Sequence, residues 1–255
     1  MKLWLRQLAA RAGVVAASRR FASQRAFFEA RLDPRSPVGL RLSLSVLLVI
    51  GATWLFGGVA EDVVTGDPLV DVDMAIALWF RAHATPGLTR WMLLVTNAHG
   101  TVGISILGVA FALYLLWRKD AYWLLALAAV LPGGVLVNLL LKQVFRRARP
   151  SLDDPLLHLA TYSFPSGHAT AATLFYGVLA AYLAARMPTW RTRLLPLAGA
   201  VFLVAVVGLT RVYLGVHYFS DVVAAAAWSS AWIIMWLVAV DALCRRNELQ
   251  RPPRA

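Results

Sequence analysis

The chain has 255 residues, of which 60% are hydrophobic and only 15% are charged, and its mean hydropathy is +0.65. A soluble domain normally carries about 25% charged residues, so this composition excludes an ordinary soluble protein and favours a polytopic helical membrane protein. The net charge of +12 would indicate nucleic-acid binding in a soluble chain. Membrane topology accounts for it better here, and we expect no nucleic-acid partner.

Residues 1–39 form a basic segment with no acidic residue before Glu29. Their apolar positions are interrupted by Arg6 and Arg11, which makes the segment too broken for a signal-peptide core. A mitochondrial presequence would look similar and stays open as an alternative. We expect a cytoplasmic arm with an amphipathic helix on anionic lipid headgroups, and we assign it no chemistry.

Six apolar segments are each long enough to cross a bilayer as a helix, which needs about 20 residues. They lie at 40–60, 100–117, 121–141, 168–186, 194–212 and 219–243. The expected fold is therefore all-α, with a six-helix membrane domain over 40–243 and a basic cytoplasmic tail over 244–255.

The second and third of these segments contain interruptions. Because 88–96 is also apolar, either one long span begins near Leu88, or Asn97–Gly100 separates an interfacial helix from a short span. In the third segment, Pro132 followed by two glycines predicts a kink, which we attribute to packing.

The distribution of Lys and Arg orients the six spans. With the N terminus in the cytoplasm, 18 of the 25 basic residues lie inside and seven outside, so the positive-inside rule places both termini in the cytoplasm. Five of the outer cations lie in two polar breaks between spans, at Lys142, Arg146, Arg147, Arg149 and Arg211. Because the crossings alternate, both breaks and the start of the fourth span meet at one outer face, which indicates an anion site there.

The first polar cluster runs from Lys142 to Pro150. Lys142 and Arg149 are seven positions apart, so they would share a face if the helix continued between them, and Pro150 would then end the helix. Taken alone, this cluster is also consistent with a basic collar of snorkelling side chains. Arg146 and Arg147 would meet lipid headgroups or a second phosphate, and both interpretations are open.

The second cluster is Phe164–His168, directly before an apolar helix. Ser166 is predicted to cap that helix, and Gly167 would let a ligand approach the backbone. The free N–H groups and the helix dipole then provide a seat for an anion. His168, in the first turn, would deliver or remove a proton at a phosphate ester oxygen.

The third cluster runs from Thr210 to Asp221. If Ser220 begins a helix, Asp221 lies in its first turn and accepts the proton on one ring nitrogen of His217. The other nitrogen is then free to act as a nucleophile or base. Arg211 adds a forked cation suited to a phosphate. Taken alone, His217 could equally be an interfacial side chain between two spans.

Together, three cations, a helix N terminus and two histidines suit in-line phosphoryl transfer, in which one histidine attacks and the other protonates the leaving oxygen. The sequence has no zinc-type ligand spacing and no Walker glycine loop. Asp153 and Asp154 could hold a divalent ion, but adjacent loop acids are more often solvated. We therefore expect no metal and no cofactor.

The patterns Lys-x6-Arg-Pro, Pro-Ser-Gly-His and Arg-x5-His-x3-Asp, in this order, resemble the type 2 phosphatidic acid phosphatase family of membrane lipid phosphatases. The resemblance implies that His217 is a nucleophile forming a phosphohistidine, that Asp221 orients it and that His168 is the general acid. It also implies a metal-free phosphate site made of Lys142, Arg149, Ser166, Gly167 and Arg211. The third motif usually opens with Ser where this chain has Thr210, which keeps the hydroxyl.

The expected function is therefore an integral-membrane phosphatase in a bacterial inner membrane, with its active site facing the periplasm at the outer ends of the last four spans. Candidate substrates are undecaprenyl pyrophosphate, phosphatidylglycerol phosphate, phosphatidic acid and similar lipids. A lipid-to-lipid phosphotransferase using the same site is an alternative, and a non-catalytic carrier that binds anionic lipid is another. The sequence predicts no particular oligomeric state.

Several other polar residues receive structural interpretations. Asn138 either faces the site or makes an interhelical hydrogen bond. Tyr213 and Tyr218 are expected to be interfacial belt aromatics. His83, His99 and His158 have no partner at useful spacing in the sequence, and loop or interfacial positions are expected for them.

Overall fold

The computed structural model describes residues 39–66, 68–151 and 161–249. The predicted N-terminal arm, apart from residue 39, and the loop residues Asp153, Asp154 and His158 lie outside the described residues, as does the end of the predicted tail. The chain divides into two compact units, Met1–Leu48 and Val49–Ala255. In the first unit, the described part is residues 39–48, which include the first turns of helix α2.

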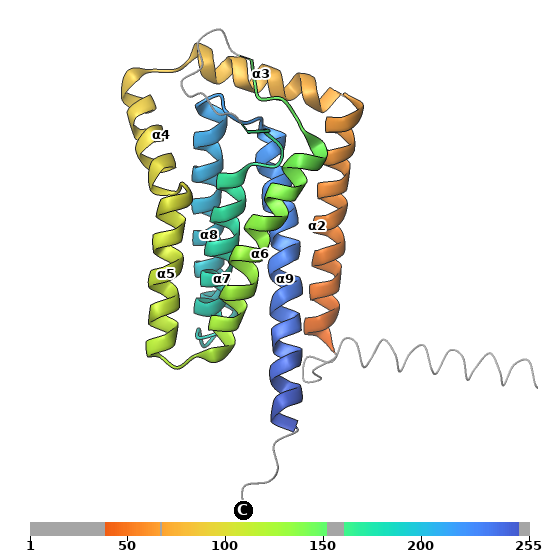
Figure 1. Ribbon diagram of the computed structural model, residues 1–255, viewed down its shortest axis with the longest axis vertical. Helices are drawn as coiled ribbons and strands as arrows, with labels where there is room; N and C mark the ends of the chain where they lie inside the picture. The colour runs from red at the N-terminus through yellow and green to blue at the C-terminus, as the bar shows by residue number, and fades with distance from the viewer. Residues whose placement is uncertain (1–38, 67, 152–160, 250–255) are drawn as a thin grey trace, which may run out of the picture. The chain divides into compact units, whose positions relative to one another are not determined.

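The described residues form eight helices and no strand, which confirms the predicted all-α class (Figure 1). In chain order they are α2 (Leu40–Thr65), α3 (Pro68–Ala82), α4 (Pro86–Ala98), α5 (Thr101–Trp117), α6 (Ala121–Phe145), α7 (Gly167–Ala184), α8 (Trp190–Tyr213) and α9 (Phe219–Leu249).

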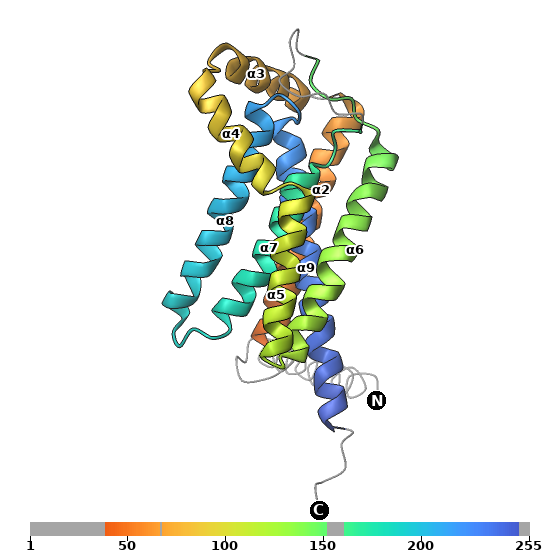
Figure 2. The ribbon, with the colours of Figure 1, turned by 60° about the vertical axis from the view of Figure 1, so that its left-hand side comes forward.

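Four of these helices, α2, α6, α8 and α9, are long and apolar enough to cross a membrane, as expected for a multi-pass membrane protein. Helices α4 and α5 would together provide a fifth span, but they are bent by 46° at the break between them (Figure 2). The break falls at His99 and Gly100, inside the predicted interruption. Helix α7 is not among these candidates, so the six-span layout stays a prediction.

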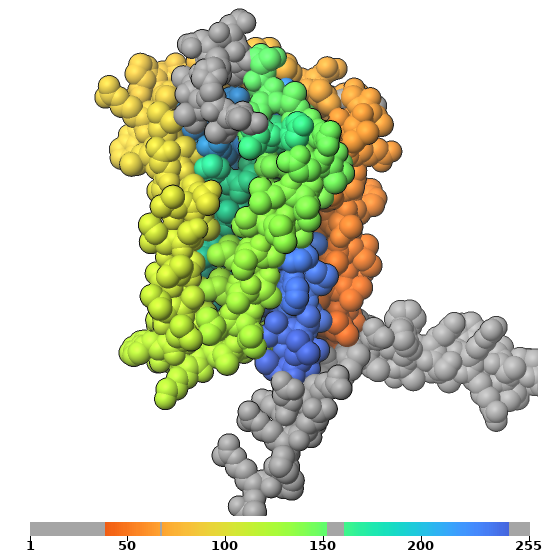
Figure 3. All heavy atoms as spheres, in the orientation of Figure 1, coloured from red at the N-terminus to blue at the C-terminus, as the bar shows by residue number. Residues whose placement is uncertain are grey.

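Helix α7 lies among α5, α6, α8 and α9 and contacts all four of them. On the face drawn in Figure 3, α5 and α6 cover most of α7, which appears only in a narrow strip between them. Small residues allow the close packing: a Cβ added to Gly134 of α6 would lie 2.5 Å from Leu174 of α7, and one added to Gly177 would lie 2.5 Å from Ile233 of α9. Helix α6 runs through Pro132 without ending there.

Helix α3 is an element that the hydropathy pattern did not predict. Its only buried residues are Asp73 and Ala77. It contacts α8 and α9 and lies across the end of the second unit at which α8 ends and α9 begins (Figure 1). A helix with one buried carboxylate therefore adjoins the predicted site.

The connections at this end differ from the prediction in one respect. Helix α6 ends at Phe145, because Arg146 adopts a left-handed conformation with φ 46° and ψ 33°. The helix therefore does not continue to Arg149, the condition on which Lys142 and Arg149 would share a helix face is not met, and Arg149 approaches the site from a loop. Between α8 and α9 the chain turns at Gly215, whose φ of 67° favours glycine.

Candidate active site

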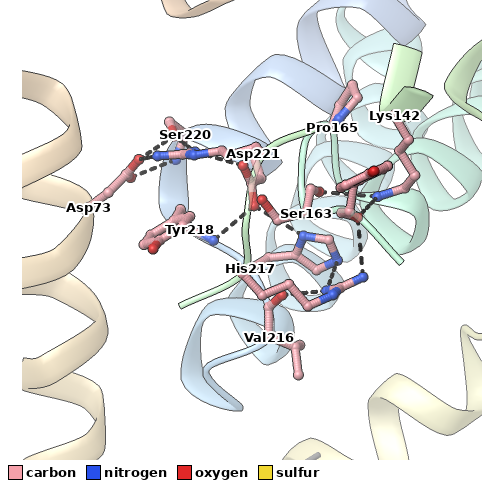
Figure 4. Close-up of polar contacts among 12 residues, drawn as sticks. Asp73, Lys142, Ser163, Pro165, Val216, His217, Tyr218, Ser220 and Asp221 are labelled. Carbon is pink, nitrogen blue, oxygen red and sulfur yellow. Dashed lines mark hydrogen bonds and ion pairs between the residues drawn. The ribbon is translucent and has the colours of Figure 1, made fainter. Parts of the chain in front are cut away.

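The eight residues predicted to form the site come from the ends of four helices, α6 to α9, and from two of the loops that join them, and they meet at one end of the second unit. Lys142 lies in the last turn of α6, Arg211 lies in the last turn of α8, and Asp221 lies in the first turn of α9. The loop before α7 is joined directly to α9, because the backbone N–H of Ser166 donates to the carbonyl of Asp221 at 3.1 Å. Figure 4 shows how the central residues of this site lie.

His217 and Asp221 form the predicted pair. Nδ1 of His217 donates to Oδ2 of Asp221 at 3.1 Å, and the backbone N–H of Tyr218 donates to the same oxygen at 3.0 Å (Figure 4). The loop is closed onto α8, because the carbonyl of Arg211 accepts from the backbone N–H of His217. The i,i+4 spacing across the start of a helix therefore produces the contact expected from it.

The buried position of His217 decides its protonation. Its side chain is only 3% exposed, and burial lowers the pKa of His217 to about 4, although the hydrogen bond and charge of Asp221 act in the opposite direction. The imidazole is therefore neutral at pH 7. Since Nδ1 carries the proton donated to Asp221, Nε2 carries the free lone pair.

Arg149 lies directly against that free nitrogen. Its Nη1 is 3.2 Å from Nε2 of His217 and also donates to the carbonyl of Val216 (Figure 4). The rest of the guanidinium donates to the carbonyl and hydroxyl oxygens of Thr161, at 2.7 and 2.9 Å. Burial lowers the pKa of Arg149, opposed by the charge of Asp221. A cation is thus fixed beside the lone pair of His217.

Lys142 contributes a second cation from α6. It is buried, and its Nζ donates to the carbonyls of Tyr162 at 2.6 Å and Ser163 at 3.1 Å (Figure 4). One turn earlier, Nδ2 of Asn138 donates to Oγ1 of Thr170 at 2.9 Å. Of the two interpretations of Asn138, the structure therefore has the interhelical hydrogen bond.

Gly167 begins α7 beside these two side chains. A Cβ added there would lie 3.6 Å from Oδ1 of Asn138 and 4.0 Å from Cε of Lys142. Because Gly167 has no side chain, the backbone N–H groups at the N terminus of α7 stay accessible to a ligand near the cations of the site.

Two buried polar atoms of the predicted phosphate site have no hydrogen-bond partner among the described residues: Oγ of Ser166 and Nε of Arg211. Ser166 is the N-cap residue of α7, but its hydroxyl makes no capping hydrogen bond, so that part of the prediction is wrong. Nη1 of Arg211 donates to Oγ1 of Thr96 in α4 at 2.6 Å. Buried polar groups are normally paired, and these two donors suit a bound oxyanion.

His168 lies in the first turn of α7 and is half-buried. Arg211, His217, Arg149 and His99 all lie close enough to act electrostatically on its ring. A Cβ added to Gly100, at the break between α4 and α5, would lie 3.6 Å from Nε2 of His168. The backbone of this break therefore packs close to the second predicted catalytic histidine.

His83 and His99 lie in the turns directly after α3 and α4, as predicted, but the ring of His99 has a distant partner that sequence spacing did not indicate. Nε2 of His99 lies 2.8 Å from the hydroxyl of Tyr176 in α7, and Nδ1 donates to the carbonyl of Val95 at 2.8 Å. Nδ1 of His83 donates to the carbonyl of Trp79 in α3. His99 therefore joins the α4–α5 break to α7, whereas His83 makes a local contact.

Two predicted belt aromatics are instead buried within the protein. The hydroxyls of Tyr213 and Thr89 lie 3.0 Å apart and share a hydrogen bond between α8 and α4. The ring of Tyr218 lies under the guanidinium of Arg147, whose Cζ is 4.1 Å from the ring centroid. The hydroxyl of Thr210 donates to the carbonyl of Val207 in its own helix.

Sequence reasoning missed the role of Arg147 and of its partner in α3. Arg147 makes ion pairs with Asp221 at 2.7 Å and with Asp73 at 2.8 Å. The charge of Arg147 is therefore taken up by two carboxylates of the protein itself. No local sequence pattern predicts these ion pairs, since Arg147 is 74 positions from each carboxylate. In the part of the chain that the structure describes, no three His, Cys, Asp or Glu side chains gather as a metal site would require.

The chain is similar in sequence and in fold to known membrane phosphatases. The sequence model of the PAP2 superfamily matches residues 121–243. Phosphatidylglycerophosphatase B of Bacillus subtilis is 36% identical over 106 residues, which cover 40% of this chain and half of that protein. Lipid A 1-phosphatase of Rhizobium etli is 32% identical over 174 residues, which cover 62% of this chain and 68% of that protein.

Solved structures give the same result. The crystal structure of a PAP2-type phosphatidylglycerolphosphate phosphatase from Bacillus subtilis superposes with a TM-score of 0.63 at 27% identity, covering 81% of this chain and 98% of that one. LpxE of Aquifex aeolicus, at 20% identity, has a TM-score of 0.52 over 65% of this chain and 94% of that one, which is a likeness of fold. The resemblance inferred from the three motifs is thus confirmed, and the chain belongs to the PAP2 superfamily.

Proposed function

We propose that this protein is an integral-membrane phosphatase that hydrolyses a lipid phosphate or lipid pyrophosphate through a phosphohistidine on His217. The observation that carries the proposal is the state of His217: a buried, neutral imidazole with its Nδ1 proton donated to Asp221 at 3.1 Å. Nε2 faces Arg149 at 3.2 Å. A nucleophile held in this tautomer beside a cation suits attack on an anionic phosphorus centre.

In the first step, the lone pair on Nε2 of His217 forms a bond to phosphorus as the bond from phosphorus to the leaving oxygen breaks. His168 gives its proton to that oxygen, so the leaving oxygen carries no negative charge. The leaving group is the dephosphorylated lipid for a phosphate monoester, or the lipid monophosphate for a pyrophosphate. Asp221 stabilises the positive charge that develops on the imidazole of His217.

In the second step, water attacks the phosphohistidine. His168, now unprotonated, takes a proton from this water as the oxygen bonds to phosphorus. The bond from phosphorus to Nε2 breaks, which releases inorganic phosphate and restores both histidines. The same residue thus acts as acid and then as base, as microscopic reversibility requires.

The oxyanion ligands are Lys142, Arg149, Arg211, the hydroxyl of Ser166 and the N–H groups at the start of α7. The unpartnered Oγ of Ser166 and Nε of Arg211 support this assignment, because a phosphoryl oxygen would supply the missing acceptors. Gly167 leaves the helix N terminus open to the ligand.

A lipid phosphate is the proposed substrate class because the related proteins named above act on lipids that carry a phosphate. A further relative, decaprenylphosphoryl-5-phosphoribose phosphatase of Mycobacterium tuberculosis, is 36% identical over 115 residues. These relatives differ in headgroup and in tail. We therefore propose the shared chemistry, a phosphate monoester or pyrophosphate on a membrane lipid.

The proposed location is a bacterial inner membrane, with the site at the periplasmic ends of α6–α9 and both termini in the cytoplasm. The support for this orientation is the distribution of charge, since 18 of the 25 basic residues fall on the proposed cytoplasmic side. We also propose that the basic N-terminal arm contacts anionic lipid headgroups.

The experiment that tests this function measures phosphate release by purified protein against a panel of lipid phosphates and lipid pyrophosphates. Substrate labelled in the transferred phosphoryl group should leave a base-stable, acid-labile label on the protein, and His217→Ala should abolish both label and turnover. His83→Ala is the matched control, because His83 is exposed in the turn after α3 and its ring bonds locally to the carbonyl of Trp79. Full turnover by folded His217→Ala would exclude the mechanism.

A further inference from the structure

The carboxylate of Asp221 is held from two sides. Oδ2 accepts from His217 and from the backbone N–H of Tyr218, whereas Oδ1 accepts from Nη1 of Arg147 at 2.7 Å (Figure 4). Its side chain is fully buried. Asp221, which aligns the proposed nucleophile His217, is therefore itself held by Arg147. Arg147 is not a defining position of any of the three sequence motifs.

The guanidinium of Arg147 is held beside Asp221 by several other contacts with the protein. Nη1 also donates to Oγ of Ser220 at 2.7 Å, Nη2 donates to Oδ2 of Asp73 at 2.8 Å, and the guanidinium stacks on Tyr218. Its carbonyl accepts from the backbone N–H of Ser163 at 2.9 Å. Both ends of the planar fork and one of its faces are thus occupied by protein groups, which leaves Arg147 no role as a phosphate ligand.

Asp73 completes the arrangement from α3. Its Oδ1 accepts from the backbone N–H of Ser220 at 2.9 Å, and its Oδ2 accepts from the hydroxyl of Ser220 and from Arg147. The carboxylate therefore caps α9 from another helix, at the residue directly before Asp221. Asp73 is fully buried.

We infer that Asp73 and Arg147 form a charged clamp that positions Asp221, and through it His217, so that α3 is part of the support of the active site. This inference rests on the proposed function, since it assigns positioning residues to that reaction. It extends the working unit to α3, which lies outside the residues 121–243 matched by the family.

The clamp is needed because the negative charge of a buried carboxylate must be compensated by a nearby cation. Two carboxylates and one guanidinium lie together here, and a buried carboxylate without a partner strongly favours its neutral form. Arg147 thus keeps Asp221 an acceptor for Nδ1–H of His217. Asp73 fixes the other end of the guanidinium, because a fork bound at one end alone would be free to turn away from Asp221.

The test is a double-mutant cycle that combines Asp73→Asn with Asp221→Asn. Asn keeps the shape of Asp73 and an acceptor for Ser220 but removes the charge that holds Arg147. We expect Asp73→Asn to lower kcat about tenfold with KM unchanged, because the phosphate ligands are untouched, and to lower it less than twofold in the Asp221→Asn background. The fraction of protein that binds orthovanadate normalises each kcat.

A purely structural role would give a different result, because normalisation to the fraction that binds orthovanadate removes any loss of folded protein, and kcat would then be unchanged in both backgrounds. Equal factors, or full activity of Asp73→Asn, would overturn the inference. Asp71→Asn is the matched control: Asp71 is an exposed acid in the first turn of the same helix, and its loss should leave kcat unchanged.

Should Asp73→Asn not be recovered folded, the same cycle is run with Arg147→Lys, which keeps the charge but cannot span two carboxylates. We expect Arg147→Lys to lower kcat about tenfold alone and less than twofold in the Asp221→Asn background. The proposed function is tested separately by His217→Ala. Activity of that variant removes the mechanism, whereas an inactive His217→Ala together with equal factors in the cycle removes the clamp alone.

Discussion

Nη1 of Arg149 lies 3.2 Å from Nε2 of His217, the ring nitrogen that the hydrogen bond to Asp221 leaves unprotonated. A guanidinium has no lone pair to offer, so this contact requires that Nε2 be the acceptor. One partner four positions along the chain, Asp221, and one distant partner, Arg149, therefore define a single tautomer of His217.

The two histidines should each be essential. We expect His217→Ala and His168→Ala to abolish phosphate release from a lipid phosphate while the protein remains folded and monodisperse. The labelled phosphohistidine separates their roles, because His168→Ala keeps the nucleophile. With a substrate whose leaving oxygen needs little protonation, such as an aryl phosphate, His168→Ala should still form the label, and absence of label would contradict its role as general acid.

Asp221→Asn should lower kcat by about 10²- to 10⁴-fold, less than the loss of the nucleophile. The amide removes the charge that stabilises the developing imidazolium and can present its NH₂ to Nδ1, which favours the wrong tautomer. Measured kcat, normalised to the fraction binding orthovanadate, checks this. Activity equal to that of the wild type would remove the orienting role of Asp221.

His217 should take up a proton only at a pH well below the ordinary value for histidine, because it is buried. Because burial lowers its pKa to about 4, the ring stays neutral as pH falls from 8 to 5 and takes up a proton only near pH 4. Nitrogen NMR of protein labelled at histidine, with the resonances of His217 identified by their loss in His217→Ala, reports the protonation directly and without substrate. A midpoint near 6.5, the ordinary value for histidine, would contradict the buried neutral state.

Ser166→Ala should separate binding from stability. Oγ of Ser166 is buried and has no hydrogen-bond partner among the described residues, so its removal should leave the thermal midpoint unchanged or raise it. The affinity for orthovanadate should fall about tenfold, the effect expected for loss of one hydrogen bond to a charged ligand.

The control for that variant is Ser163→Ala, since Oγ of Ser163 donates to the carbonyl of Ala148 at 3.0 Å. This variant should lower the thermal midpoint because it leaves a carbonyl unpaired. A fall in stability for Ser166→Ala without any loss of affinity would show that the hydroxyl supports the fold rather than the ligand.

Gly134→Ala should destabilise the protein by about 1–3 kcal/mol, because an added methyl group overpacks a dense helix contact. Its Cβ would lie 2.5 Å from Leu174 in α7. Gly57→Ala, in α2, meets nothing within 4 Å and should cause no loss. Thermal unfolding in one detergent compares them, and equal midpoints would contradict the close packing of α6 on α7.

Much of this protein can be predicted from local patterns in its sequence. Hydropathy predicts the helices α2, α6, α8 and α9, because a bilayer crossing requires a continuous apolar run. Spacing predicts the contact of His217 with Asp221, because a carboxylate in the first turn of a helix lies within reach of a side chain just before that helix. The three motifs predict the family, since their order and internal spacing are specific.

Other features follow from contacts between distant parts of the chain. The end of α6 at Phe145 places Arg149 in a loop, and the partner of His99 is Tyr176 in another helix. Arg147 could be seen from its sequence only as one more outer cation, because its carboxylates lie in α3 and α9.

Composition and motif spacing are enough to predict the membrane class, the family and the eight motif residues of the site, since each depends on composition or on spacing within one segment. Which cation faces His217, and which cation holds Asp221 in place, depends on how the helices pack against one another. The reason is physical: a guanidinium pairs with whichever acceptor the packing of helices brings within about 3 Å of it, and that choice depends on the positions of α3, α6 and α9 together.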